Sequence, residues 1–107
     1  MLISLSLLAI TYLQVFAQVS KWDGTTQQIT KGSGTAKDPW QIENAAQWAW
    51  ATQNSAYYGS RAVHLRLMVN LDLAPTTPGG NSPYFDRRNN DFRGFFDGNN
   101  KTISNFR

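Results

Sequence analysis

The side chains that could carry out acid–base chemistry are few in this chain. The sequence holds seven carboxylates and a single histidine, His64. A glycosidase or acid–base hydrolase needs two such groups to converge on its substrate, and the spacing of these residues gives no indication of convergence. His64 falls on the polar side of an alternating apolar stretch, where a solvated strand histidine is the favoured interpretation. The sequence therefore nominates no catalytic residue.

Motifs for metals, nucleophiles and phosphate are also missing from the sequence. The chain has no cysteine, which excludes disulfides and thiolate metal sites, and it has no Gly-x-Ser-x-Gly motif. The glycine-rich stretch 31–35 lacks the strand-to-helix setting of a phosphate loop. Asp97 offers the hard oxygens that calcium prefers, but no other carboxylates surround it, so a turn-forming role is favoured. We expect no metal and no cofactor.

Aromatic residues are the only candidates for a binding site. Flat rings can stack on a sugar or another apolar ligand when they are exposed in a row, whereas buried rings simply pack the core. For the tryptophans of the predicted helix, core packing is the favoured interpretation. The sequence nominates six rings for a ligand platform: Trp22, Trp40, Trp50, Tyr57, Tyr58 and Tyr84.

The charges do not predict a nucleic-acid partner. The formal net charge is +3, and the basic residues are scattered along the chain, with only Arg87 and Arg88 adjacent. Proteins that bind nucleic acid concentrate basic residues on one face or in one run.

Residues 1–17 have the pattern of a secretory signal peptide. The segment is apolar and uncharged, and it ends in Val15, Phe16 and Ala17, a small-residue pattern that signal peptidases accept. No Lys or Arg precedes the apolar run, which departs from the usual pattern. The run is shorter than the ~20 residues of a spanning helix, so an uncleaved anchor is the lesser alternative. We predict an exported protein that begins at Gln18 and has no membrane span after cleavage.

The mature chain divides into a polar segment, 18–38, and a structured part, 39–107. Residues 38–42 are expected to be extended because Pro39 disfavours helix before it. A helix is predicted over 45–54, capped by Asn44, with Ala45, Trp48, Ala49 and Thr52 on one face. A strand around 27–30 is only weakly indicated.

Over 63–73, aliphatic residues alternate with His64, Arg66, Met68, Asn70 and Asp72, which predicts a half-buried strand with one polar face. Residues 74–91 are rich in Pro, Gly and Asn, which predicts a long loop. Short strands are then expected at 92–96 and 102–106 around a tight turn at 97–100. These two strands form either a hairpin or the corner of a β-solenoid rung.

The order of these motifs resembles the amino-terminal part of bacterial surface proteins of the GLUG-repeat type. The resemblance rests on Gly-x-Gly-Thr at 32–35, Asp-Pro-Trp-Gln-Ile at 38–42, Trp-Ala-Trp at 48–50, Asn-Leu-Asp-Leu at 70–73 and Phe-Arg-Gly-Phe-Phe-Asp-Gly-Asn-Asn-Lys-Thr-Ile-Ser-Asn at 92–105. Asn100 and Lys101 stand where that family has glycine and histidine. The resemblance implies a mainly β fold with one α-helix, in which the helix caps the first rungs of a right-handed parallel β-helix. It covers most of the mature chain.

These observations predict an exported, non-enzymatic, adhesin-like protein of the cell surface or the secreted fraction, with a glycan or a host or cell-surface protein as its partner. Residues 102–107 have the pattern of an uninterrupted strand, so we expect the chain to be the leading fragment of a longer protein. Two alternatives stay open. One is the first segment of a β-helix enzyme, either polysaccharide-active or an IgA-protease-like peptidase; the other is a small carbohydrate-binding module.

Overall fold

The computed structural model describes residues 18–107, so the predicted signal peptide lies outside the described residues. Two helices and six short strands make up this part of the chain. In chain order they are β1 (Val19–Lys21), β2 (Trp40–Ile42), α2 (Ala45–Gln53), α3 (Ser55–Tyr58), β3 (His64–Leu67), β4 (Asn70–Asp72), β5 (Phe95–Asp97) and β6 (Ile103–Ser104). Within residues 18–107, no helix is long and apolar enough to cross a membrane.

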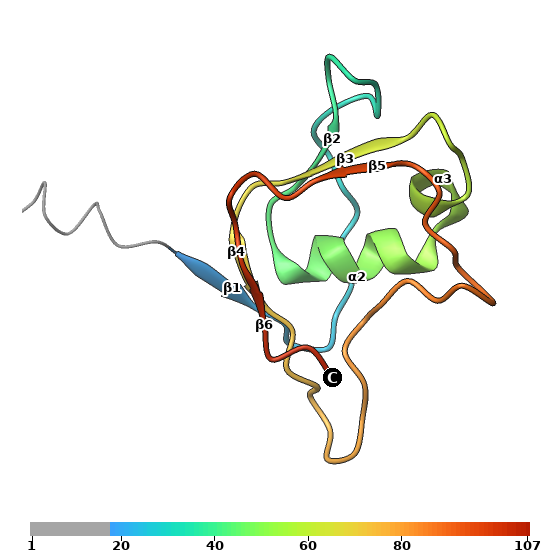
Figure 1. The fold of residues 1–107 in the computed structure, drawn as a ribbon. Helices are drawn as coiled ribbons and strands as arrows, with labels where there is room; N and C mark the ends of the chain where they lie inside the picture. Colours follow the sequence, from blue (N-terminus) through green and yellow to red (C-terminus); the bar gives the residue numbers. More distant parts are fainter. Residues whose placement is uncertain (1–17) are drawn as a thin grey trace, which may run out of the picture.

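The strands form two parallel sheets of three strands each. One sheet has the order β1-β4-β6 and the other the order β2-β3-β5, and every neighbouring pair is parallel. The register places Leu65 between Trp40 and Phe96, and Leu71 between Ser20 and Ile103. Figure 1 shows β5 running along β3 and β6 along β4, so consecutive passes of the chain lie side by side.

The fold is a small mixed α/β structure, and the predicted mainly β fold with a right-handed parallel β-helix is wrong. The strands are only two to four residues long and belong to two separate sheets, and residues 18–107 contain two helices instead of one. Helix α2 contributes Ala45, Trp48 and Ala51 to the same core as the strand leucines. Alternation along a strand shows that one face is buried but not what buries it, and here a helix shares that role.

The predicted helix is confirmed at Ala45–Gln53, one residue shorter than expected. The Asn44 side chain accepts a hydrogen bond from the Gln47 amide at 2.8 Å, which satisfies a backbone donor that has no partner within the helix. All four residues of the predicted inner face are buried. Helix α3 follows directly after Asn54 and had no sequence signal.

The predicted strand over 63–73 is two strands in different sheets. The chain bends at Met68 and Val69, between β3 and β4, so the alternation continues around a corner. At this corner the Met68 amide donates to the Ile42 carbonyl at 2.9 Å, and the Asn99 side-chain amide donates to the Leu67 carbonyl at 3.1 Å. The inward leucines of both strands are almost fully buried: Leu65, Leu67, Leu71 and Leu73.

The last part of the chain follows the predicted order of loop, strand, turn and strand. No helix or strand occurs in residues 74–91, and the weakly indicated strand at 27–30 does not form. Strands β5 and β6 lie in different sheets, which excludes a hairpin. Between them Asn99 and Asn100 have positive φ angles of 52° and 55°, as expected for turn asparagines.

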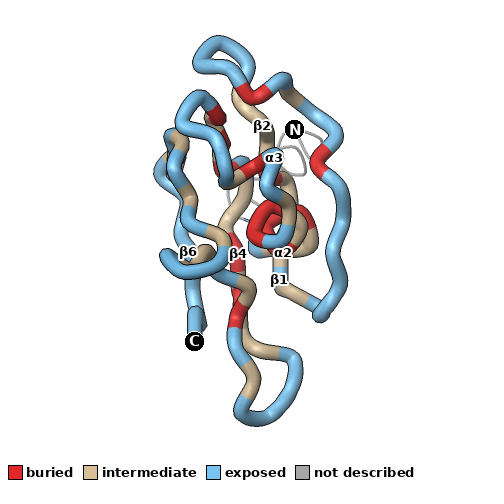
Figure 2. Tube along the Cα trace, turned by 90° about the vertical axis from the view of Figure 1, so that its right-hand side faces the viewer, coloured by how far each residue is buried: buried red, intermediate tan, exposed pale blue. Residues whose placement is uncertain are grey.

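The two ends of the strand stack differ in how they are covered. At one end, segment 27–38 runs beside β2, with the Gln41 amide donating to the Lys31 carbonyl at 3.0 Å, and the Gln27 amide donates to the Ala46 carbonyl of α2 at 3.0 Å. We call β2, α2 and segment 27–38 the covered end. Strands β5 and β6 with Phe106 form the open end, where every residue of both strands is exposed. Figure 2 shows buried residues in α2 and β4 and exposed residues toward the C-terminus.

Candidate functional site

The six aromatic residues nominated from the sequence lie in different parts of the structure. Tyr57 is buried, and its ring meets that of Trp40 edge-on with 5.5 Å between the centroids. Trp50 is half-buried against the core, and its indole nitrogen is buried without a partner among the described residues. These three rings therefore serve packing more than ligand contact.

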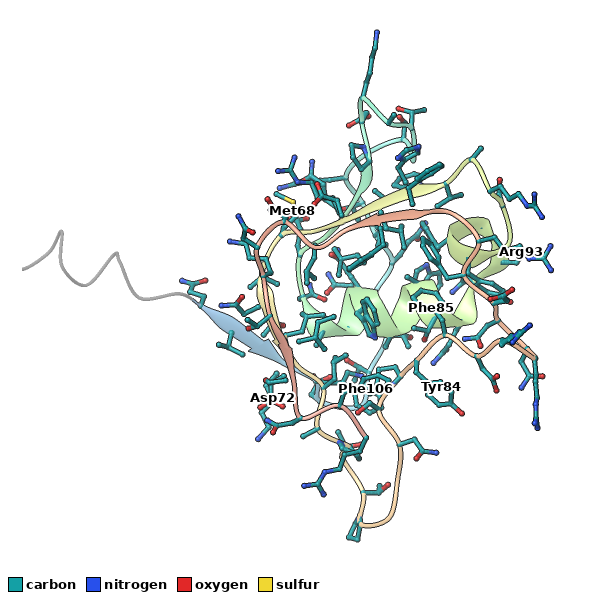
Figure 3. All side chains as sticks on the ribbon, in the orientation of Figure 1. Met68, Asp72, Tyr84, Phe85, Arg93 and Phe106 are labelled. Carbon is teal, nitrogen blue, oxygen red and sulfur yellow. The ribbon has the colours of Figure 1, made fainter. Side chains whose placement is uncertain are left out.

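The other three nominated rings are more accessible but separate. The half-buried Trp22 donates its indole N–H to the Thr25 carbonyl at 2.9 Å. Tyr58 packs edge-on against Phe85, with ring centroids 6.5 Å apart. Tyr84 is 42% exposed and lies beside Phe106, with ring centroids 6.4 Å apart, as Figure 3 shows. Of the six, only Tyr84 adjoins the open end.

Most of the large apolar side chains that are exposed among residues 18–107 lie at the open end, and the sequence analysis did not nominate them. Phe95 is 60% exposed, Phe106 52%, Phe96 41% and Ile103 37%. One signal for this surface was present in the sequence. In a strand, consecutive side chains point to opposite faces, so the adjacent Phe95 and Phe96 cannot both face the core.

The open end is anchored firmly to the core. Phe96 meets the ring of Trp48 edge-on at 5.8 Å, and Trp48 in turn meets Phe85 at 5.5 Å. The Trp48 indole donates to the Pro83 carbonyl at 2.8 Å, which fixes the orientation of this ring. On the other side of β5, the ring of Phe95 stacks on His64 with a centroid distance of 4.5 Å and an interplanar angle of 12°.

Both strands of the open end have a backbone edge without a neighbouring strand. Strands β5 and β6 are each the last member of their sheet. The Phe95 amide donates to the Val63 carbonyl, and the carbonyls of Thr102 and Ser104 accept from β4 and the residue after it. Because the polar groups of a parallel strand alternate between its two sides, those of Phe96 and Ile103 face away from the sheet.

Polar side chains border this apolar surface. The Arg66 guanidinium lies 3.4 Å from an Asp97 carboxylate oxygen and donates to the Asn99 side-chain oxygen at 2.9 Å. Asn105 donates to the Asp72 carboxylate at 3.0 Å, and this bond, with a second from the Ala74 amide, lowers the pKa of Asp72. An apolar centre with a polar border is the usual anatomy of a protein–protein interface.

The residues considered for catalysis or calcium have structural partners. One Asp97 carboxylate oxygen accepts from the Asn99 amide at 2.9 Å, and the other faces Arg66. This geometry is that of a turn-forming aspartate held by its own loop. Within residues 18–107, no three His, Asp or Glu side chains gather closely enough to hold a metal ion.

No protein family, no curated protein and no solved structure matches this chain. The resemblance to GLUG-repeat surface proteins therefore stays a prediction from the order of its motifs.

Proposed function

We propose that this chain is an exported, non-enzymatic, adhesin-like protein, and that it makes contact through the open end. The observation that carries this proposal is the coincidence of exposed apolar side chains with unpaired strand edges. Phe96 and Ile103 supply both features, and Phe95 and Phe106 extend the apolar area. Monomeric proteins usually blunt such an edge with charges or prolines on the strand, and β5 carries only Asp97.

The chemistry of the open end favours an extended polypeptide as its occupant. A bound strand satisfies the outward amide and carbonyl groups of Phe96 and Ile103, and its apolar side chains cover the phenylalanine rings. A glycan could stack on the rings, but its hydroxyl groups do not match the regular spacing of a strand edge. The occupant that fits is therefore an extended polypeptide segment that adds a parallel strand to the sheets.

A pair of synthetic peptides tests the docking mode. One is a ten-residue peptide of alternating valine and threonine, and the other has proline in place of each threonine, which removes every second backbone donor and is not tolerated within a paired strand. We expect fluorescence anisotropy to detect binding of the first peptide only. Equal binding of both peptides would show that strand addition is not the mode of contact.

Charge substitutions locate the surface. Ile103→Lys and Phe95→Lys place a charge on each edge strand and are expected to abolish peptide binding. Val19→Lys is the matched control, because Val19 is 58% exposed on β1, away from the open end. Loss of binding in the control as well would contradict the assignment.

Two other outcomes would identify a different occupant. Concentration-dependent dimers that Phe95→Lys disrupts would identify a second copy of this chain. Binding of neutral glycans but not of peptide would favour the carbohydrate-binding alternative.

Export is tested separately from docking. Production of the full chain in a bacterial host should release a product whose N-terminal residue is Gln18, as measured by mass spectrometry of the periplasmic and medium fractions. Retention of an intact Met1 N-terminus in the cytoplasm would contradict export and leave the docking result unaffected.

A further inference from the structure

A second surface, formed by the loop before β5 and by helix α3, gathers positive charge. Residues 86–93 form a loop beside α3, and a surface pocket of about 290 Å³ lies between them. Arg87, Arg88 and Arg93 line this pocket together with Tyr58 and Asn89. Figure 3 shows the Arg93 side chain extending outward from the body of the protein.

The loop that carries these arginines is fixed to the core. The Asn90 side chain donates to the Thr52 carbonyl at 2.6 Å and to the Tyr84 carbonyl at 2.8 Å. The Arg93 amide donates to the Tyr58 carbonyl at 3.1 Å, which ties the end of the loop to α3. Because the loop is held at its middle and at its end, its backbone is already ordered. Less conformational entropy of the loop is therefore lost when a ligand binds.

The positive charge of this pocket is largely uncompensated. Asp91 is the only carboxylate in its lining, and it lies 3.8 Å from the Arg93 guanidinium. One carboxylate oxygen of Asp86 accepts a hydrogen bond from the Arg88 amide at 2.9 Å, so this carboxylate stabilises the turn. Among residues 18–107, no carboxylate forms a salt bridge with the guanidinium of Arg87 or Arg88.

We propose that this pocket binds an acidic sugar, through a sulfate or carboxylate group held by Arg87 and Arg88. Guanidinium groups present a planar array of N–H donors that matches two oxygens of an oxyanion at once. The half-buried ring of Tyr58 in the pocket wall gives an apolar surface for the C–H groups of a sugar ring. The site is separate from the open end and does not depend on the function proposed for it.

A sugar fits this pocket better than a nucleic acid does. A nucleic acid presents a line of phosphates and needs a matching track of basic residues. Here three arginines gather at one pocket, and the other basic residues are scattered along the chain without forming a run; two of them, Lys31 and Arg66, pair with Glu43 at 3.0 Å and with Asp97 at 3.4 Å.

Binding of dextran sulfate, with neutral dextran as the matched probe, tests the proposal. We expect the mature chain to bind dextran sulfate and not dextran in surface plasmon resonance at physiological salt. Polygalacturonate, which carries carboxylates only, tells whether sulfate or carboxylate is the recognised group. If the mature chain bound neither dextran sulfate nor polygalacturonate, the proposal would be overturned.

Two double variants of equal charge test the location. Arg87→Gln with Arg88→Gln should weaken binding by about tenfold or more, because charge-assisted hydrogen bonds are lost. Lys37→Gln with Lys101→Gln removes the same charge from exposed sites away from the pocket and should change affinity less than about twofold. Circular dichroism checks that both variants fold. Equal weakening by the two variants, or tighter binding of a single-stranded oligonucleotide than of dextran sulfate, would overturn the proposal.

Discussion

The covered end and the open end of this protein use similar apolar strands but differ in what lies over them. At the covered end, Ile42 of β2 and Leu65 of its neighbour β3 are almost completely inaccessible. At the open end, β5 pairs with the same β3, yet all three of its residues are exposed. The difference is that segment 27–38 hydrogen-bonds to β2 and to α2, whereas among residues 18–107 no further strand pairs with the outer edge of β5 or β6.

This contrast shows that hydrophobicity alone does not determine burial in a stack of short strands. An apolar side chain in a middle strand is covered from two sides, whereas one in a terminal strand is covered from one side. The terminal strand is therefore the place where apolar residues remain available for another molecule.

The largest expected effect comes from removing core volume between the two ends. Leu71 is fully buried in β4, so Leu71→Ala should lower the free energy of unfolding by about 2–5 kcal/mol. Phe95→Ala, at the open end, should change it by only about 0.5 kcal/mol, although it removes more atoms. Urea denaturation of both variants measures the contrast, and equal losses would contradict the distinction between the ends.

The next largest loss of stability is expected where β5 packs against β3. A Cβ atom on Gly94 would collide with the Val63 carbonyl oxygen, which accepts the hydrogen bond from the Phe95 amide. Gly94→Ala should therefore cost roughly 1–3 kcal/mol of stability. Gly98→Ala is the control, since its Cβ would meet only Phe96 at 4.0 Å. Urea midpoints compare the two, and an unchanged midpoint for Gly94→Ala would show that β5 shifts freely.

A smaller effect is expected at the helix of the covered end. Asn44→Ala removes the side-chain acceptor for the Gln47 amide and should cost about 1 kcal/mol. Gln53→Ala, at the exposed last residue of α2, should leave the thermal midpoint nearly unchanged. If the two variants melt alike, the cap does not stabilise the covered end.

The smallest effect is on the titration of two exposed carboxylates. The Asn105 side chain lowers the pKa of Asp72, and the Thr25 side chain lowers that of Asp23. A lowered pKa in the folded state means that each bond stabilises the protein above the usual carboxyl pKa and is lost as the pH falls through the lowered value. Both contributions are small because the groups are exposed.

Asn105→Gly tests the cause of the lowered pKa of Asp72. Glycine keeps the positive φ of 57° at position 105 but lacks the amide. NMR titration should show the pKa of Asp72 rising toward its usual value while that of Asp23 stays unchanged. A pKa of Asp72 that does not move would assign the lowering to the Ala74 amide, the second cause.

Local structure was largely predictable from the sequence. Asn44 as a cap, the buried face of α2, the extended segment before it and the turn asparagines all follow from residues close to one another in the chain. The candidate site was not predictable in the same way. The nominated rings of Trp40 and Tyr57 pack against each other, whereas Phe95, Phe96 and Phe106, which the sequence did not nominate, are exposed together with the nominated Tyr84.

The sequence by itself determined where α2 forms, where the chain turns before β6 and which residues of the stretch 63–73 face the core, because these depend on neighbouring residues and on backbone sterics. Only the tertiary structure decided that the alternating stretch 63–73 splits between two sheets, and that segment 27–38 lies beside β2 while the residues of β5 and β6 stay exposed. It also brought Arg87, Arg88 and Arg93 to one pocket beside Tyr58. Such outcomes depend on which distant segments pack together, and a local sequence pattern does not specify the segment that packs against it.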